Sequence, residues 1–128
     1  MNPEFKPNNY NSVSPYLVVN GAAATIEFLK RAFGAIELRS YPGAAGKLAH
    51  AEVRIDDTVV MLADGMEGWP ALPCHVHVYV SDVDATYRRA LAAGAISVQE
   101  PVRKGDEDKR SGVKDPSGTT WWIATQVG

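Results

Sequence analysis

Three histidines and one glutamate are the side chains of this sequence whose spacing suits metal binding or proton transfer. His75 and His77 form an H-x-H pair, and His50 is followed two residues later by Glu52. Residues two apart on a strand share a face, so each pair would lie on one face of its strand. Two imidazoles so placed can share a metal ion, and a histidine can also shuttle a proton. We prefer the simpler interpretation, two hydrogen-bonded or solvated pocket histidines, because no third ligand is evident.

The segments that carry these residues are typical of strands. HAEVRI (50–55) alternates polar and apolar residues, and TVVMLA (58–63) follows it after Asp56-Asp57, which predicts a hairpin. HVHVYV (75–80) alternates in the same way. His50 and Glu52 are therefore expected on one strand of a first sheet, and the H-x-H pair on a later strand.

An internal repeat organises the chain. ATIEFLKRAFGAI (24–36) matches ATYRRALAAGAI (85–96) with one residue dropped, and TVVMLA (58–63) matches TTWWIA (119–124). The first segment of each half has helical spacing and ends at a glycine, Gly34 or Gly94. Each half thus reads β-α-β-β-β. Neither half can bury its sheet face alone, so the two modules must form one domain of the α+β class.

The repeat also sets the boundaries. Two open sheets with helices on their outer faces would leave their inner faces free to curve around a cleft. The charged run RKGDEDKR (103–110) is predicted to be a solvated loop. The predicted parts are a flexible N-terminal arm (1–12) and a single domain (13–126) made of module one (13–64), a linker (65–73) and module two (74–126).

Composition excludes several classes of partner. The formal net charge is −2 and the isoelectric point about 5.9, whereas nucleic acid or an anionic membrane favours a basic patch. The first residues lack the pattern of a signal peptide, and no stretch approaches the ~20 apolar residues of a membrane span. Cys74 is the single cysteine, which fits a reducing compartment. We expect a cytoplasmic protein with no nucleic-acid or membrane partner.

Two segments carry a resemblance to a known family. HAEVRIDDTVVMLADG (50–65) and RSGVKDPSGTTWWIATQ (110–126), in a tandem β-α-β-β-β chain, resemble hairpins of the vicinal-oxygen-chelate superfamily, which comprises glyoxalases, bleomycin resistance proteins and dioxygenases. The closer likeness is to its PhnB-like branch. The resemblance covers roughly residues 13–126 and implies a homodimer, in which some relatives exchange modules between chains. Because this fold hosts many chemistries, it does not imply one activity.

The resemblance also implies where a metal ion would bind in the metal-dependent relatives. Their four ligand positions, usually His or Glu, correspond here to a position near Ser14 and to Met61, His75 and Trp122. Of these side chains only His75 is a good ligand for a borderline metal ion. We therefore expect no cofactor and no four-ligand metal site, although a divalent metal in a rearranged site stays an alternative.

Strand alternation extends the cleft from these positions. If His75 faces the cleft, so do His77 and Tyr79, while Val76 and Val78 face the helices. A cleft with aromatic, sulfur-containing and imidazole side chains suits a planar or partly apolar organic molecule. The predicted ligand-binding residues are His50, Glu52, Met61, His75, His77, Tyr79 and Trp122, with His75 and His77 as weak metal candidates.

Three functions follow from these expectations. The first is a small-molecule-binding protein that sequesters or carries an aromatic or partly apolar ligand, with no catalytic residue assigned. The second is a metal-dependent lyase, isomerase or dioxygenase with a rearranged site built from His50, Glu52, His75 and His77. The third is an accessory or interaction protein without a small ligand. We favour binding, because three of the four metal positions have lost their ligands.

Overall fold

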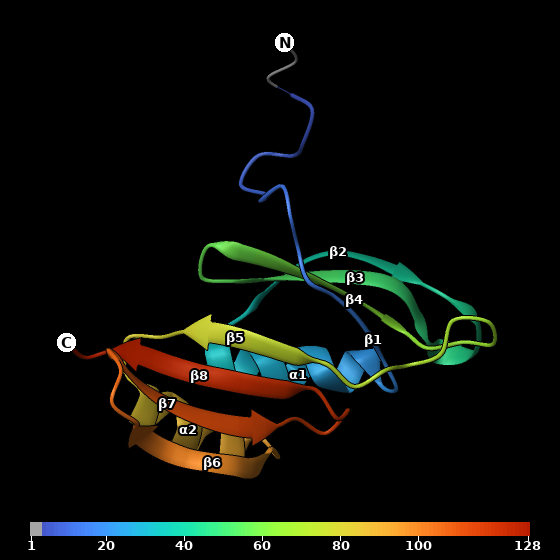
Figure 1. Ribbon diagram of the computed structural model, residues 1–128. Helices are drawn as coiled ribbons and strands as arrows, with labels where there is room; N and C mark the ends of the chain where they lie inside the picture. The colour runs from blue at the N-terminus through green and yellow to red at the C-terminus, as the bar shows by residue number, and fades with distance from the viewer. Residues whose placement is uncertain (1–3) are drawn as a thin grey trace.

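The computed structural model describes residues 4–128, whose strands form two four-stranded sheets (Figure 1). The first module contains β1 (Tyr16–Val19), α1 (Ala22–Phe33), β2 (Ile36–Pro42), the short 3-10 helix η1 (Ala44–Gly46), β3 (Leu48–Ile55) and β4 (Thr58–Asp64). The second contains β5 (His75–Tyr79), α2 (Val83–Ala92), β6 (Ile96–Arg103), β7 (Asp108–Lys114) and β8 (Thr120–Gln126). The predicted α+β class and the repeated β-α-β-β-β unit are confirmed.

The two sheets share one strand order. In module one the order is β1-β4-β3-β2, and in module two it is the equivalent β5-β8-β7-β6. The first strand of each module pairs in parallel with the last, and the other neighbours are antiparallel. This order places His77 directly opposite Trp122 and places Met61 between Tyr16 and Glu52.

The helix ends are held by two aspartates. The Asp82 carboxylate caps α2 by accepting from the backbone N–H of Ala85 at 3.1 Å. Helix α1 lacks a capping side chain of its own, and Asp64 at the end of β4 accepts instead from the N–H groups of Gly21 and Ala22. With 12 and 10 residues, neither helix in the described part of the chain is long enough to cross a bilayer.

One continuous apolar core joins the modules. Trp121 of β8 is fully buried and contacts Phe33 of α1, with ring centroids 5.2 Å apart. Helices α1 and α2 contact each other, and Arg89 of α2 donates to the carbonyl of Ala32. The alternation predicted for the strands is visible in this core, which takes Ala51, Val53 and Ile55 from β3 and has Cys74, Val76, Val78 and Val80 packed against it.

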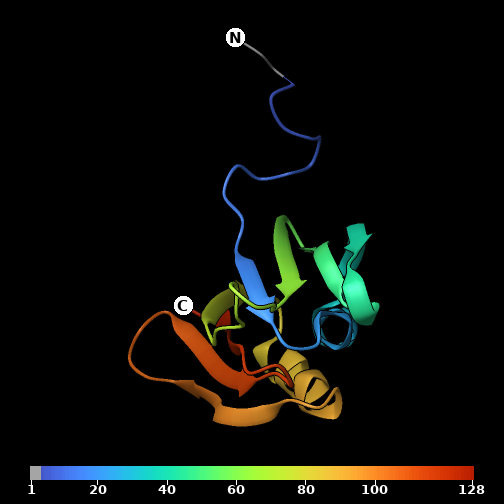
Figure 2. The same cartoon turned by 90° about the vertical axis from the view of Figure 1, so that its right-hand side faces the viewer.

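Both helices lie in the angle between the two sheets. In Figure 2 they are side by side, with β2 and β3 above α1 and β6 below α2. The sequence-based expectation placed the helices on the outer faces of both sheets. Within one chain they instead pack against each other, because the apolar faces of both helices are buried in the same core. The helix-free face of each sheet therefore points away from that of the other.

The charged run 103–110 is not a loop throughout, and that prediction was wrong at both ends. Arg103 is the last residue of β6, and β7 begins at Asp108, so only the residues between these strands connect them. Asp108 and Arg110 are held in the strand by partners across the sheet, as described below. The sequence alone does not show which residues pair across the sheet, so this charged run was predicted to be solvated.

Candidate functional site

A flat aromatic surface lies on the helix-free face of module two. The indole N–H of Trp122 donates to Nδ1 of His75 at 3.1 Å, and the two ring planes differ by only 8°. The ring centroids are 6.2 Å apart, so the two rings are parallel and offset from each other. We call this pair, His75 and Trp122, the aromatic platform. Its hydrogen bond requires that Nδ1 of His75 carry no proton.

Gly112 supports the platform from below. It pairs with Trp122 across β7 and β8, and a Cβ atom built on it would lie 2.6 and 2.8 Å from two carbons of the indole. The indole therefore lies directly over the glycine backbone, with its opposite face directed away from the sheet. Trp122 is only half-buried and His75 is exposed, so this outer face is open to a stacking partner.

Replacing Gly112 with alanine is expected to displace the indole and to lower the free energy of unfolding by about 1–3 kcal/mol. Urea denaturation of the single variants Gly112→Ala and Trp122→Ala and of the double variant checks this. Because the clash needs both side chains, the double variant should lose less stability than the sum of the single losses. Additive losses would show that the indole does not rest on Gly112.

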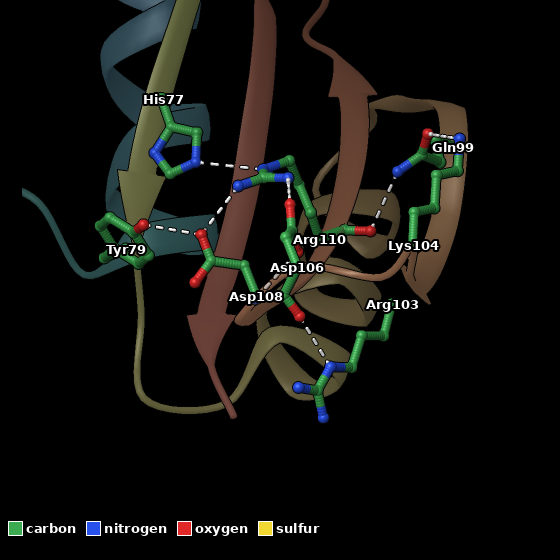
Figure 3. A network of polar contacts seen from close by, with 8 residues as sticks. All are labelled: His77, Tyr79, Gln99, Arg103, Lys104, Asp106, Asp108 and Arg110. Carbon is green, nitrogen blue, oxygen red and sulfur yellow. Dashed lines mark hydrogen bonds and ion pairs between the residues drawn. The ribbon is translucent and has the colours of Figure 1, made fainter. Parts of the chain in front are cut away.

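Beside the platform, His77 and Tyr79 belong to a polar network with β7 (Figure 3). Arg110 donates through Nε to Nε2 of His77 at 3.2 Å and through Nη2 to the Asp108 carboxylate at 2.8 Å. The Tyr79 hydroxyl donates to the same carboxylate at 2.7 Å. This bond raises the pKa of Tyr79, so the phenol stays protonated. Asp106 completes the network with an ion pair to Arg110.

The network keeps His77 neutral. Burial lowers the pKa of His77, the neighbouring Arg110 charge lowers it further, and Asp108 opposes both only in part. Nε2 is already an acceptor for Arg110, so this nitrogen is not free to bind a metal ion. His77 and Tyr79 thus lie on the predicted face. Both side chains are held there by hydrogen bonds to residues of β7.

The lowered pKa of His77 predicts a specific loss of stability in acid. The folded protein binds this proton less readily than the unfolded chain, so stability is complete above about pH 6.5 and falls as the pH drops toward the lowered folded pKa. His77→Gln keeps an acceptor for Arg110 but does not titrate. Thermal melts between about pH 7 and pH 5 should show a smaller acid loss in this variant. An identical loss in both proteins would contradict the assignment.

His50 and Glu52 lie on the helix-free face of module one. His50 Nε2 is 2.8 Å from Oε2 of Glu52, and the Tyr10 hydroxyl donates to Oε1 at 2.5 Å. Burial raises the pKa of Glu52, but the hydrogen bonds from Tyr10 and His50 outweigh it and hold the pKa below its ordinary value. Tyr16 of β1 is hydrogen-bonded to the other imidazole nitrogen at 2.9 Å. Met61 lies on β4, between β1 and β3, where it pairs with Tyr16 on one side and Glu52 on the other. Its side chain is half-buried.

The end of the N-terminal arm is held on this face. Besides the Tyr10 contact, the side chain of Asn11 accepts from the backbone N–H of Val59, and Arg54 donates to the carbonyl of Asn9. Val59 is fully buried although it belongs to the helix-free face. The arm thus covers part of the predicted cleft wall. The boundary of the arm at residue 12 stays a prediction.

The donor set does not fit the metal ion of the metal-dependent relatives. Within residues 4–128 no group of three or more His, Cys, Asp or Glu side chains is positioned to hold a metal ion. At the four predicted positions, Trp122 and Met61 offer no good donor, and Nδ1 of His75 already accepts from Trp122. Ser14 is hydrogen-bonded to Asn11. In the rearranged alternative, at least one ring nitrogen of each histidine and both oxygens of Glu52 already have hydrogen-bond partners within the chain.

Several residues of these faces were not singled out from the sequence. Tyr10, Tyr16 and Tyr41 contact His50 or Glu52, and Gly112 supports Trp122. Trp69, which the sequence suggests as an anchor or as a cover for a partner's cleft, contacts Tyr16. Strand alternation offered a signal for Tyr16, because Leu17 and Val19 of the same strand are buried. Tyr10 carried no such signal, since it lies outside any strand.

Three comparisons place the chain among known proteins. The family model described as Glyoxalase/Bleomycin resistance protein/Dioxygenase superfamily matches residues 10–123. The uncharacterized protein Rv0887c of Mycobacterium tuberculosis is 39% identical over 127 residues, which cover 91% of this chain and 75% of that protein. TioX from Micromonospora sp. ML1 superposes with a TM-score of 0.72 at 26% identity, over 91% of this chain and 100% of TioX.

A further solved structure shows the same fold. TnmS3, an antibiotic binding protein from Streptomyces sp. CB03234, has a TM-score of 0.69 at 19% identity, over 91% of this chain and 99% of that chain. The family model spans both modules, including the platform and the aromatic residues around His50. The chain therefore belongs to the glyoxalase/bleomycin resistance protein/dioxygenase superfamily.

Proposed function

We propose that this protein binds a planar, partly apolar organic molecule by stacking and does not convert it. The observation that carries the proposal is the aromatic platform, whose two rings are parallel within 8° and whose outer face is open. An exposed aromatic surface of this kind gains dispersion and apolar burial when a second ring covers it. That TnmS3 is named an antibiotic binding protein supports a binding role.

We further propose that the complete cleft is formed by two chains. The helix-free faces of modules one and two point away from each other within a chain, so one ligand cannot contact both. A homodimer that apposes module one of one chain with module two of the other would bring them together. An isologous dimer would then contain two equivalent clefts. Sedimentation equilibrium that detects only monomer at micromolar concentration would contradict this arrangement.

The rearranged metal enzyme is less well supported, since each of its candidate ligands already has a hydrogen-bond partner within the chain. Placement in the PhnB-like branch, a cytoplasmic location and the exclusion of nucleic acid and membrane partners stay predictions.

Isothermal titration calorimetry with a panel of planar aromatic and peptide antibiotics tests the proposal. We expect saturable binding with one ligand per chain, and we expect the ligand to be recovered chemically unchanged. Enzymatic turnover of a bound molecule, detected by mass spectrometry of the recovered ligand, would overturn the assignment as a binding protein.

A further inference from the structure

Four rings form a continuous line across the helix-free face of module one. Ring centroids are 5.6 Å apart from Trp69 to Tyr16, 5.5 Å from Tyr16 to His50 and 5.9 Å from His50 to Tyr41. We call this line the aromatic row. Tyr16, Tyr41 and Trp69 are 41–52% exposed, whereas His50 is largely covered by its neighbours. The row is a second apolar aromatic surface, on the opposite module from the aromatic platform.

A chain of hydrogen bonds passes through the centre of the row. Glu52 is 4% exposed, and both carboxylate oxygens have partners, Tyr10 and Nε2 of His50. An ionised carboxylate only accepts hydrogen bonds. The Nε2 atom of His50 must therefore carry its proton and donate it to Glu52. This bond fixes the tautomer of the neutral imidazole and leaves Nδ1 to face Tyr16.

The tautomer of His50 then decides what Tyr16 offers outward. Because Nδ1 accepts from the Tyr16 hydroxyl, the phenol proton is engaged and the oxygen lone pairs are available. Tyr16 is thus an acceptor toward any molecule that covers the row.

We propose that Tyr16 determines the ligand's chemistry: the ligand is a planar aromatic molecule bearing a hydroxyl group that donates to the Tyr16 oxygen, whose own proton is engaged by Nδ1 of His50. The inference rests on the proposed function, because it takes the aromatic row as the second wall of the cleft. It assigns a ligand class to a wall that the platform does not define.

The Glu52 carboxylate stays ionised to lower pH than an ordinary glutamate, because hydrogen bonds from Tyr10 and His50 hold its pKa below the usual value. It therefore keeps accepting from Nε2 of His50, and the tautomer of the imidazole stays fixed.

The test compares two probes that differ in one hydrogen-bond donor, 2-naphthol and 2-methoxynaphthalene. Both share the ring system and an accepting oxygen, but only the naphthol donates. Calorimetric titrations of the full chain at about pH 8 should show about fivefold tighter binding of 2-naphthol, the effect of one net hydrogen bond.

Two variants locate the effect. Tyr16→Phe should abolish the preference, because both probes then lack an acceptor at this position of the row. Tyr41→Phe is the matched control, because it removes a hydroxyl of the row that makes no hydrogen bond to His50, and it should keep the wild-type preference.

The outcomes separate this inference from the proposed function. Equal affinity for both probes at about pH 8, with both lost in Trp122→Ala, would overturn the role of Tyr16 and support the platform. A Tyr16-dependent preference together with wild-type affinity for both probes in Trp122→Ala would support the row and overturn the platform. If neither probe bound, the inferred ligand class would be overturned. The titrations with antibiotics would then remain the test of the platform.

Discussion

Replacing Trp121 with alanine is expected to lower the free energy of unfolding by about 3–5 kcal/mol, the largest loss we predict for a single substitution. Trp121 is 0% exposed and packs against Phe33 of α1, so its removal leaves a cavity where the modules meet. The total free energy of unfolding of a domain of this size is about 5–15 kcal/mol. The loss would therefore remove a large share of the total free energy of unfolding.

A buried hydrogen bond adds to this loss. The Trp121 indole N–H donates to Oδ2 of Asp115 at 2.9 Å, while Oδ1 accepts from the backbone N–H groups of Ser117 and Thr119. Asp115 is only 3% exposed, so the carboxylate that shapes the β7–β8 turn would lose a charge-assisted partner. Trp121→Phe, which keeps most of the volume, should cost about 1–3 kcal/mol through this bond alone.

Urea denaturation followed by circular dichroism measures both changes. The neighbouring Trp122→Ala serves as the matched control, because this indole is half-exposed and lies on the other face of the same strand. It should cost distinctly less than Trp121→Ala. If the two alanine variants lost equal stability, the assignment of one tryptophan to the core and the other to the open face would be wrong.

Trp122→Ala is expected to have the largest effect on binding, a loss of affinity of about thirtyfold or more for a planar ligand. The substitution removes most of the aromatic platform and leaves His75 without the donor at Nδ1. Calorimetry or ligand fluorescence measures the change. Trp122→Phe keeps a ring but loses the hydrogen bond, so it should retain part of the affinity.

A control on the same sheet guards against indirect effects. Ile96 on β6 is 70% exposed and contributes to neither the platform nor its support. Ile96→Ala should bind the ligand as the wild type does. If Trp122→Ala bound with unchanged affinity, the ligand would have to lie elsewhere on the protein.

The features that repeat locally were predictable from the sequence. The internal repeat gave both modules, because a β-α-β-β-β unit with matched helices and hairpins leaves its pattern in neighbouring residues. Strand alternation separated Trp121 from Trp122 correctly, since residues one apart on a strand face opposite sides. The same alternation placed His75 and His77 together on the helix-free face.

Features that depend on tertiary pairing were not predictable. Tyr16 meets His50 across 34 positions of sequence, and Arg110 meets His77 across 33. Neither spacing leaves a local pattern, so the run that contains Arg110 was interpreted as a loop. The packing of the helices between the sheets was missed for the same reason. A module's own sequence predicts which helix face is apolar but not which surface will cover it.

The central claim is that a planar ligand stacks on the aromatic platform, and a crystal structure of the complex with a ligand identified by titration tests it most directly. The account predicts a ligand ring parallel to Trp122, about 3.5–4.0 Å from its outer face, with the aromatic row of a second chain on the other side. A ligand seated instead in the groove between the β3–β4 turn and β5, against Asp57, Val76 and Trp121, would contradict it.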